Sequence, residues 1–119
     1  MRMKSVASLF LFSALTYAAG DIEIPVYPGS SIEEEDSIPS SKPDQDLWDV
    51  LYKAPASPEQ VLEFYRGSPY VKKCEVNPMA DNYLCELKAF NRIIAGTLFI
   101  DRKAKRGKVE VYASYFCKK

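Results

Sequence analysis

The chain has 119 residues, with 16 basic and 16 acidic residues, three cysteines and no histidine. A chain of this length allows one domain. Without histidine, the sequence excludes Ser-His-Asp and Cys-His catalysis, histidine metal sites and a histidine pH switch.

The N-terminal residues are typical of an export signal. Residues 1–4 are basic, and residues 6–15 form an apolar run that is too short to span a bilayer. Small residues at 18–20 fit cleavage before Asp21 or one residue earlier. We therefore predict that residues 1–20 are a signal peptide and that the mature chain is periplasmic or secreted, without a transmembrane segment. The alternative is an uncleaved N-terminal anchor.

Residues 21–46 are predicted to form an extended N-terminal segment followed by an acidic loop. Residues 21–27 alternate and contain Pro25, which favours an edge strand. Residues 30–43 are polar and have too little apolar content to pack, so a mobile loop is expected. Its acidic run, 33–36, could bind calcium or a basic partner. The run lacks the alternating ligands and turn glycine of a calcium loop, which favours a solvated charge run.

Residues 47–119 are predicted to form an α+β domain. Residues 57–69 read as a helix, with Ser57 as N-cap and Pro58 at the first helical position. Five strands are expected, at 47–53, 70–76, 83–90, 93–100 and 108–117. The predicted fold is two-layer: one helix packed on an antiparallel four- to five-stranded sheet, in strand-helix-meander order. The apolar side of the helix should lie on the last two strands, through Val61, Leu62 and Tyr65.

The three cysteines imply that one is left over or pairs between molecules. If loop 77–82 closes a symmetric hairpin, Cys74 lies directly opposite Cys85, where antiparallel geometry can accept a disulfide. We predict a Cys74–Cys85 bridge. A Cys85–Cys117 bridge across the sheet is the alternative, because strand register is only loosely determined by sequence.

A basic loop between the last two strands is the strongest surface candidate. Its residues could contact phosphates, lipid head groups or anionic glycans; they are Arg102, Lys103, Lys105 and Arg106. The alternative is a hairpin tip that charge keeps soluble. Trp48 and Tyr52 share a strand face and could stack on sugars or bases, although core packing is the more ordinary role of such residues.

Two motifs in the sequence resemble those of a protein family. Residues 25–30 (PVYPGS) and residues 57–66 (SPEQVLEFYR) are similar to the P-x-Y-P-G-[AS] opening and the SPE-x-V-x-x-FY helix of an uncharacterised bacterial exported or periplasmic domain family. The resemblance implies an envelope location and a module without enzymatic activity, and it carries over no site residues. The three cysteines depart from that family pattern.

The sequence therefore predicts a small non-catalytic binding or accessory module, with no cofactor and no metal. Its expected partner is an envelope protein or an anionic surface, and not nucleic acid. One alternative is a structural subunit that dimerises through an edge strand or the odd cysteine. Another is a small enzyme or enzyme inhibitor with an unrecognised site.

Overall fold

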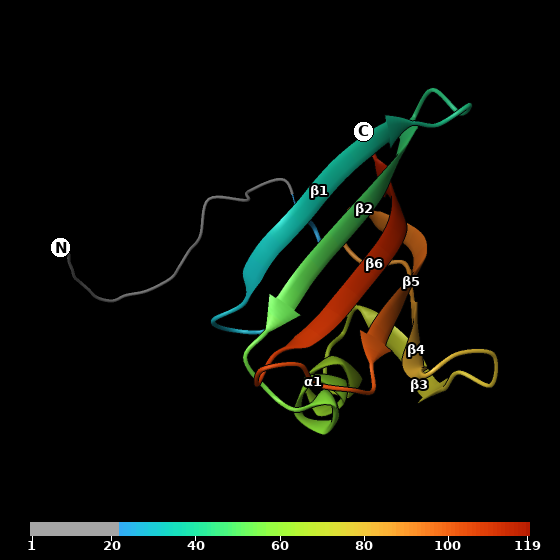
Figure 1. Cartoon of the computed structure of the whole chain (residues 1–119). Coiled ribbons are helices and arrows are strands. Elements are labelled where there is room, and N and C mark those ends of the chain that lie inside the picture. The colour runs from blue at the N-terminus through green and yellow to red at the C-terminus, as the bar shows by residue number, and fades with distance from the viewer. Residues whose placement is uncertain (1–21) are drawn as a thin grey trace, which may run out of the picture.

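The computed structural model describes residues 22–119, so the predicted signal peptide lies outside the described residues. These residues form one antiparallel six-stranded sheet in the order β1-β2-β6-β5-β4-β3, with one helix (Figure 1). The elements are β1 (Ser31–Pro39), β2 (Gln45–Ala54), α1 (Pro58–Arg66), β3 (Val71–Val76), β4 (Asn82–Leu87), β5 (Ile93–Asp101) and β6 (Val109–Lys118). No helix among the described residues has the length and apolar character needed to cross a membrane.

The predicted two-layer α+β fold is wrong, because the described chain is mostly β. Six strands are present where four or five were expected, and α1 has only nine residues. The helix contacts β3 and β5 and does not make a continuous second layer. The five strands that were predicted are confirmed to within a few residues, and β3 to β6 follow one another as a meander.

The sixth strand is β1, which replaces the mobile loop predicted for residues 30–43. It pairs with β2 along nearly its whole length, with one irregularity between Ile32 and Glu34. Most of its side chains are exposed. An edge strand of this kind is held by backbone hydrogen bonds to its neighbour, so it needs little apolar content and gave no strand signal in the sequence.

The core lies on one face of the sheet. In β6 every second residue is buried, and the same face of β2 and β5 is also buried. The buried residues of these three strands are Val50, Tyr52, Ala54, Ile93, Leu98, Ile100, Val109, Val111, Ala113, Tyr115 and Cys117. A period of two is what a half-buried antiparallel strand requires.

Helix α1 begins with a complete capping box. The Ser57 Oγ accepts a hydrogen bond from the backbone N–H of Gln60 at 3.1 Å, and the Gln60 Oε1 accepts one from the backbone N–H of Ser57 at 2.9 Å. Val61, Leu62 and Tyr65 are buried, and they belong to the same core as the sheet. The helix therefore adds its apolar side to one part of the covered face.

The N-terminal segment is not the predicted edge strand, because residues 22–28 form no strand. Buried tyrosine hydroxyls hold it instead. Tyr115 Oη accepts from the backbone N–H of Glu23 at 3.2 Å, and Tyr65 Oη donates to the carbonyl of Pro25 at 2.7 Å. Ile24, which lies between Glu23 and Pro25 in the sequence, is buried. This segment is thus fixed to the core through side chains of β6 and α1.

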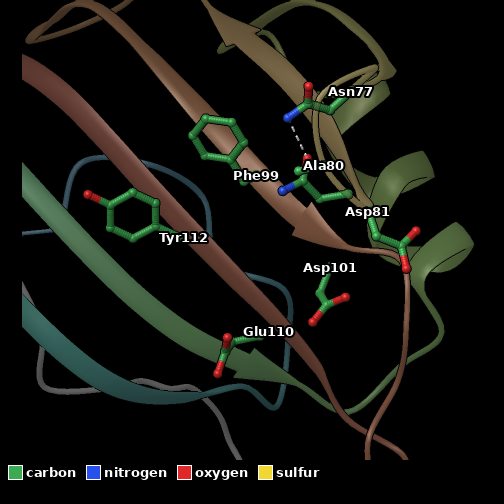
Figure 2. A pocket seen from close by; sticks show the side chains of 8 residues that line it. Asn77, Ala80, Asp81, Phe99, Asp101, Glu110 and Tyr112 are labelled. Atoms are coloured by element: carbon green, nitrogen blue, oxygen red, sulfur yellow. Dashed lines mark hydrogen bonds between the residues drawn. The ribbon is translucent and has the colours of Figure 1, made fainter.

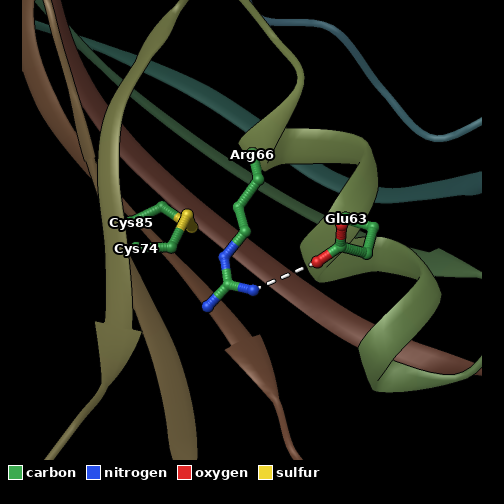
Figure 3. Close-up of a disulfide and its surroundings, with 4 residues drawn as sticks. All are labelled: Glu63, Arg66, Cys74 and Cys85. Carbon is green, nitrogen blue, oxygen red and sulfur yellow. Dashed lines mark hydrogen bonds and ion pairs between the residues drawn. A yellow bond between two sulfur atoms is a disulfide. The ribbon is translucent and has the colours of Figure 1, made fainter.

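The disulfide joins Cys74 of β3 to Cys85 of β4, with the sulfur atoms 2.07 Å apart (Figure 3). The two residues are direct partners in the β3–β4 register, as the symmetric hairpin predicted. Figure 3 shows the bridge with the ion pair between Arg66 and Glu63 of α1. Cys117 is buried as a free thiol, so the alternative bridge from Cys85 to Cys117 is not formed.

Candidate binding surfaces

The sheet face opposite the core is here called the open face. Across four strands it carries a continuous line of apolar side chains that are direct register partners. We call this line the apolar row, and it consists of Leu51, Tyr112, Phe99 and Leu84. The rings of Phe99 and Tyr112 stack with centroids 6.2 Å apart and planes 17° apart. Tyr112 is 39% exposed, so this row reaches solvent.

A second apolar group lies further along the same strands. Phe116 of β6 is flanked in the register by Leu47 of β2 and Ala95 of β5, and Leu47 is flanked in turn by Ile38 of β1. Phe116 and Ile38 are 38% and 48% exposed. Exposed aromatic and aliphatic side chains gathered on one face are typical of an interaction surface.

A polar row separates the two apolar groups. Its members are successive register partners: Asp36, Asp49, Ser114, Thr97 and Glu86. The Oδ1 atom of Asp49 is shielded from solvent and has no hydrogen-bond partner among residues 22–119. Burial, and then the nearby charge of Asp49, raises the pKa of Tyr112 above its ordinary value. Asp49 thus lies close to the Tyr112 hydroxyl, while its Oδ1 atom has no hydrogen-bond partner within residues 22–119.

A hollow of about 440 Å³ lies at the end of the apolar row, beside the β3–β4 loop (Figure 2). Figure 2 shows Phe99 and Tyr112 at one side of it, and Asp101 and Glu110 nearer the strand ends. Its remaining lining residues are Asn77, Ala80, Asp81 and Asn82. Two stacked rings beside several carboxylates form an environment that favours a cationic group.

Trp48 and Tyr52, the two residues considered for stacking on sugars or bases, do share one strand face, and that face is the covered one. Tyr52 is completely buried and its hydroxyl accepts from the backbone N–H of Tyr27 at 3.4 Å. Core packing, the more ordinary role expected for these residues, is therefore confirmed: Tyr52 is a core residue and Trp48 packs against the core. Within residues 22–119 the exposed large aromatic residues are Phe90, Tyr112 and Phe116, and the last two alternate with the buried residues of β6. These two residues could have been noticed in the sequence, because β6 carries apolar residues at its alternate buried positions and also at some of the positions between them.

The predicted anion-binding residues differ in whether they have an ion-pair partner among residues 22–119. Arg102 lies over the ring of Tyr83, with its Cζ atom 5.5 Å from the ring centroid, and its Nη1 is 3.8 Å from Asp81 Oδ1. Lys103 Nζ is 3.6 Å from Asp81 Oδ2. Lys105 and Arg106 lie in the turn between β5 and β6.

Three of these four residues line a hollow of about 550 Å³, here called the basic hollow. Arg102 is not part of it. The hollow also contains Lys53 and Lys108, and the full lining is Ser31, Glu33, Lys53, Asp101, Lys103, Lys105, Arg106, Lys108 and Glu110. Sequence reasoning missed Lys53, because it lies in a strand about fifty residues before the basic loop and joins it only through the β2–β6 pairing.

The acidic run at residues 33–36 lies in β1. No group of acidic or cysteine side chains in residues 22–119 is arranged to hold a metal ion. No family model matches the chain, and neither the curated proteins nor the solved structures contain a match to it.

Proposed function

We propose that this domain is an exported, non-catalytic binding module that docks a protein partner on its open face. The observation that carries the proposal is the apolar row of Leu51, Tyr112, Phe99 and Leu84, in which Tyr112 is exposed and the other three are partly buried, next to the unpaired carboxylate oxygen of Asp49. Aromatic residues around a shielded polar atom are the usual composition of a binding hot spot.

Charge complementarity defines the chemistry of the partner. The polar row carries Asp36, Asp49 and Glu86, and among the residues that the structure describes only Glu86 of the three is ion-paired, with Lys72 Nζ at 3.6 Å. Asp101 and Glu110 add two carboxylates at the end of the apolar row. A segment that presents apolar side chains together with lysine or arginine would therefore complement this face.

Export is supported by residues 1–20, whose pattern is that of a signal peptide. The disulfide between Cys74 and Cys85 is compatible with an oxidising compartment, and thus with a periplasmic or secreted location. The resemblance of residues 25–30 and 57–66 to bacterial exported domains supports the same location and a module without enzymatic activity. The absence of histidine from the sequence supports the non-catalytic role.

Dimerisation through the odd cysteine has less support than docking on the open face. Cys117 is 1% exposed, so an intermolecular disulfide would require β6 to open first. Burial also raises the pKa of its thiol, which lowers the fraction of reactive thiolate at neutral pH.

An array of short synthetic peptides that vary in aromatic, aliphatic, basic and acidic content tests the docking proposal. The domain should retain peptides that combine lysine or arginine with large apolar residues. Tyr112→Ser and Phe99→Ser should each weaken this binding by about tenfold, the size expected for a hot-spot side chain. Asp49→Asn should weaken the binding of basic peptides and leave neutral apolar peptides little changed.

Met79→Ser is the matched control, because Met79 is the most exposed large apolar residue among those described, and it neither belongs to the apolar row nor lines the hollow beside it. It should bind as the unmodified domain does. Equal loss in Met79→Ser and Tyr112→Ser, or a preference for acidic peptides, would contradict docking on the open face.

A further inference from the structure

We infer that the basic hollow is a second binding site, which takes a compact ligand carrying phosphate or sulfate groups. The inference rests on the cations at one end of the sheet, whereas docking on the open face rests on the apolar row; Asp101 and Glu110 line both hollows. Its cationic lining residues are Lys53, Lys103, Lys105, Arg106 and Lys108.

The site is assembled from three separate parts of the chain. Ser31 at the start of β1 is the register partner of Lys53 near the end of β2, and Lys53 is in turn the partner of Glu110 in β6. The turn between β5 and β6 supplies the other cations. The pairing of β2 with β6 therefore brings Lys53 to a cluster that is distant in sequence.

The turn has a fixed geometry. The backbone N–H of Lys105 donates to the carbonyl of Lys108 at 2.8 Å, and the N–H of Lys108 donates to the carbonyl of Lys105 at 3.0 Å. Arg106 and Gly107 lie between them with φ of 55° and 77°. Two successive positive φ values define the two-residue turn that best matches strand twist, and asparagine or glycine are the usual residues there. Arginine at the first position places a guanidinium at the tip in spite of this preference.

Most of these cations have no partner of their own. No ion pair within residues 22–119 involves Lys53, Lys105, Arg106 or Lys108, and only Lys103 is paired, with Asp81. Five cationic side chains and three carboxylates line the same hollow. An anion placed among the cations would relieve their mutual repulsion, and the Ser31 hydroxyl offers a further hydrogen-bond donor.

The carboxylates restrict the kind of anion. Glu33, Asp101 and Glu110 lie among the cations, so a broad uniform negative surface would meet repulsion as well as attraction. A compact ligand can place its oxyanion groups on Lys53, Lys105 and Arg106 and avoid the carboxylates. Phosphate and sulfate groups match the donors of lysine and arginine.

Calorimetric titration with inorganic pyrophosphate at fixed ionic strength tests the site. Lys53→Ser and the double variant Lys105→Ser/Arg106→Ser should each weaken binding at least fivefold. Glu110→Gln and Glu33→Gln should strengthen it, because each removes a negative charge from the lining. Lys42→Ser is the matched control: it removes the same charge from the β1–β2 loop, at the opposite end of the sheet, and should leave the affinity unchanged.

Sedimentation with vesicles of phosphatidylcholine containing phosphatidylglycerol distinguishes the source of the phosphate. Binding of pyrophosphate alone identifies a soluble ligand, and binding of both pyrophosphate and vesicles, each weakened by Lys53→Ser, identifies the phosphate of a lipid head group; either result supports the site. Binding of vesicles without pyrophosphate, binding of neither probe, or equal weakening by Lys42→Ser and Lys53→Ser would overturn it. Tyr112→Ser should leave the pyrophosphate affinity unchanged, so the failure of one proposed surface can be told from the failure of the other.

Discussion

Two buried tyrosines hold the N-terminal segment against the covered face of the sheet. The hydroxyls of Tyr65 and Tyr115 reach the backbone of residues 22–28 and fix that segment against the core. Burial raises the pKa of Tyr115 strongly, so its hydroxyl remains a neutral hydrogen-bonding group over the ordinary pH range. Buried tyrosines of this kind form a hydrogen bond between the hydroxyl and the backbone, and their rings contribute to core packing.

Cys117 provides a prediction at alkaline pH. Burial raises the pKa of its thiol from 9.0 to about 11. Between those values the unfolded chain loses the thiol proton and the folded chain keeps it, so the free energy of unfolding should fall as the pH rises. The loss should reach about 3 kcal/mol once the pH exceeds the folded pKa.

Urea unfolding at several pH values above 8, together with thiolate absorbance in the ultraviolet, would measure this effect. Cys117→Ala serves as the control, since lysine and tyrosine titration remains in that variant. Its stability should fall less steeply with pH than that of the unmodified domain. Parallel pH profiles for the two proteins would show that the buried thiol does not cause the loss.

At the scale of elements, removing the capping box at the start of α1 should measurably lower the stability of the domain. Ser57→Ala removes the acceptor for the Gln60 N–H, and should lower the free energy of unfolding by about 1 kcal/mol. Gln60→Ala removes only the reciprocal contact to the Ser57 N–H and should cost less. Urea unfolding of both variants checks the order, and a larger loss for Gln60→Ala would contradict the assigned roles.

The sequence predicts an element well where one face of that element is buried. In β6 the alternation of Val109, Val111 and Ala113 is strong because every second residue enters the core. The helix was equally clear, since Ser57 and Pro58 mark its start. Strand β1 could not be recognised, because an exposed edge strand obtains its stability from backbone pairing and leaves no apolar pattern.

The candidate surfaces were only partly predictable for a related reason. Lys103, Lys105 and Arg106 are neighbours in sequence and could be grouped at once, but Lys53 reaches them through strand pairing. The phase of a strand shows which residues share a face, but it does not show which face will be covered. The sequence could therefore place Trp48 and Tyr52 on one face together, but it could not show that Tyr112 would lie on the other, open face.

At the scale of the whole molecule, the disulfide secures the strands farthest from β1. Cys74 and Cys85 are separated by 11 positions, and closing a loop of this length should stabilise the fold by about 3 kcal/mol through the unfolded state. The double variant Cys74→Ala/Cys85→Ala should therefore unfold at lower urea concentration.

Reduction of the unmodified protein should give a similar loss of stability, and the double variant should not respond to the reductant. A loss well below 1 kcal/mol in both cases would mean that β3 and β4 are held by other contacts. Cys117 is retained in both proteins, so the comparison reports on the bridge alone.

The acidic edge strand has a consequence for how the domain behaves in solution. The backbone groups on the outer side of β1 are uncovered, and this edge carries four consecutive carboxylates at Glu33, Glu34, Glu35 and Asp36. Charge therefore takes the place of a physical cover in keeping strands of other molecules away. Such protection weakens when salt screens the carboxylates. The same edge that repels other copies at low ionic strength should therefore be the place where self-association begins as the salt concentration rises.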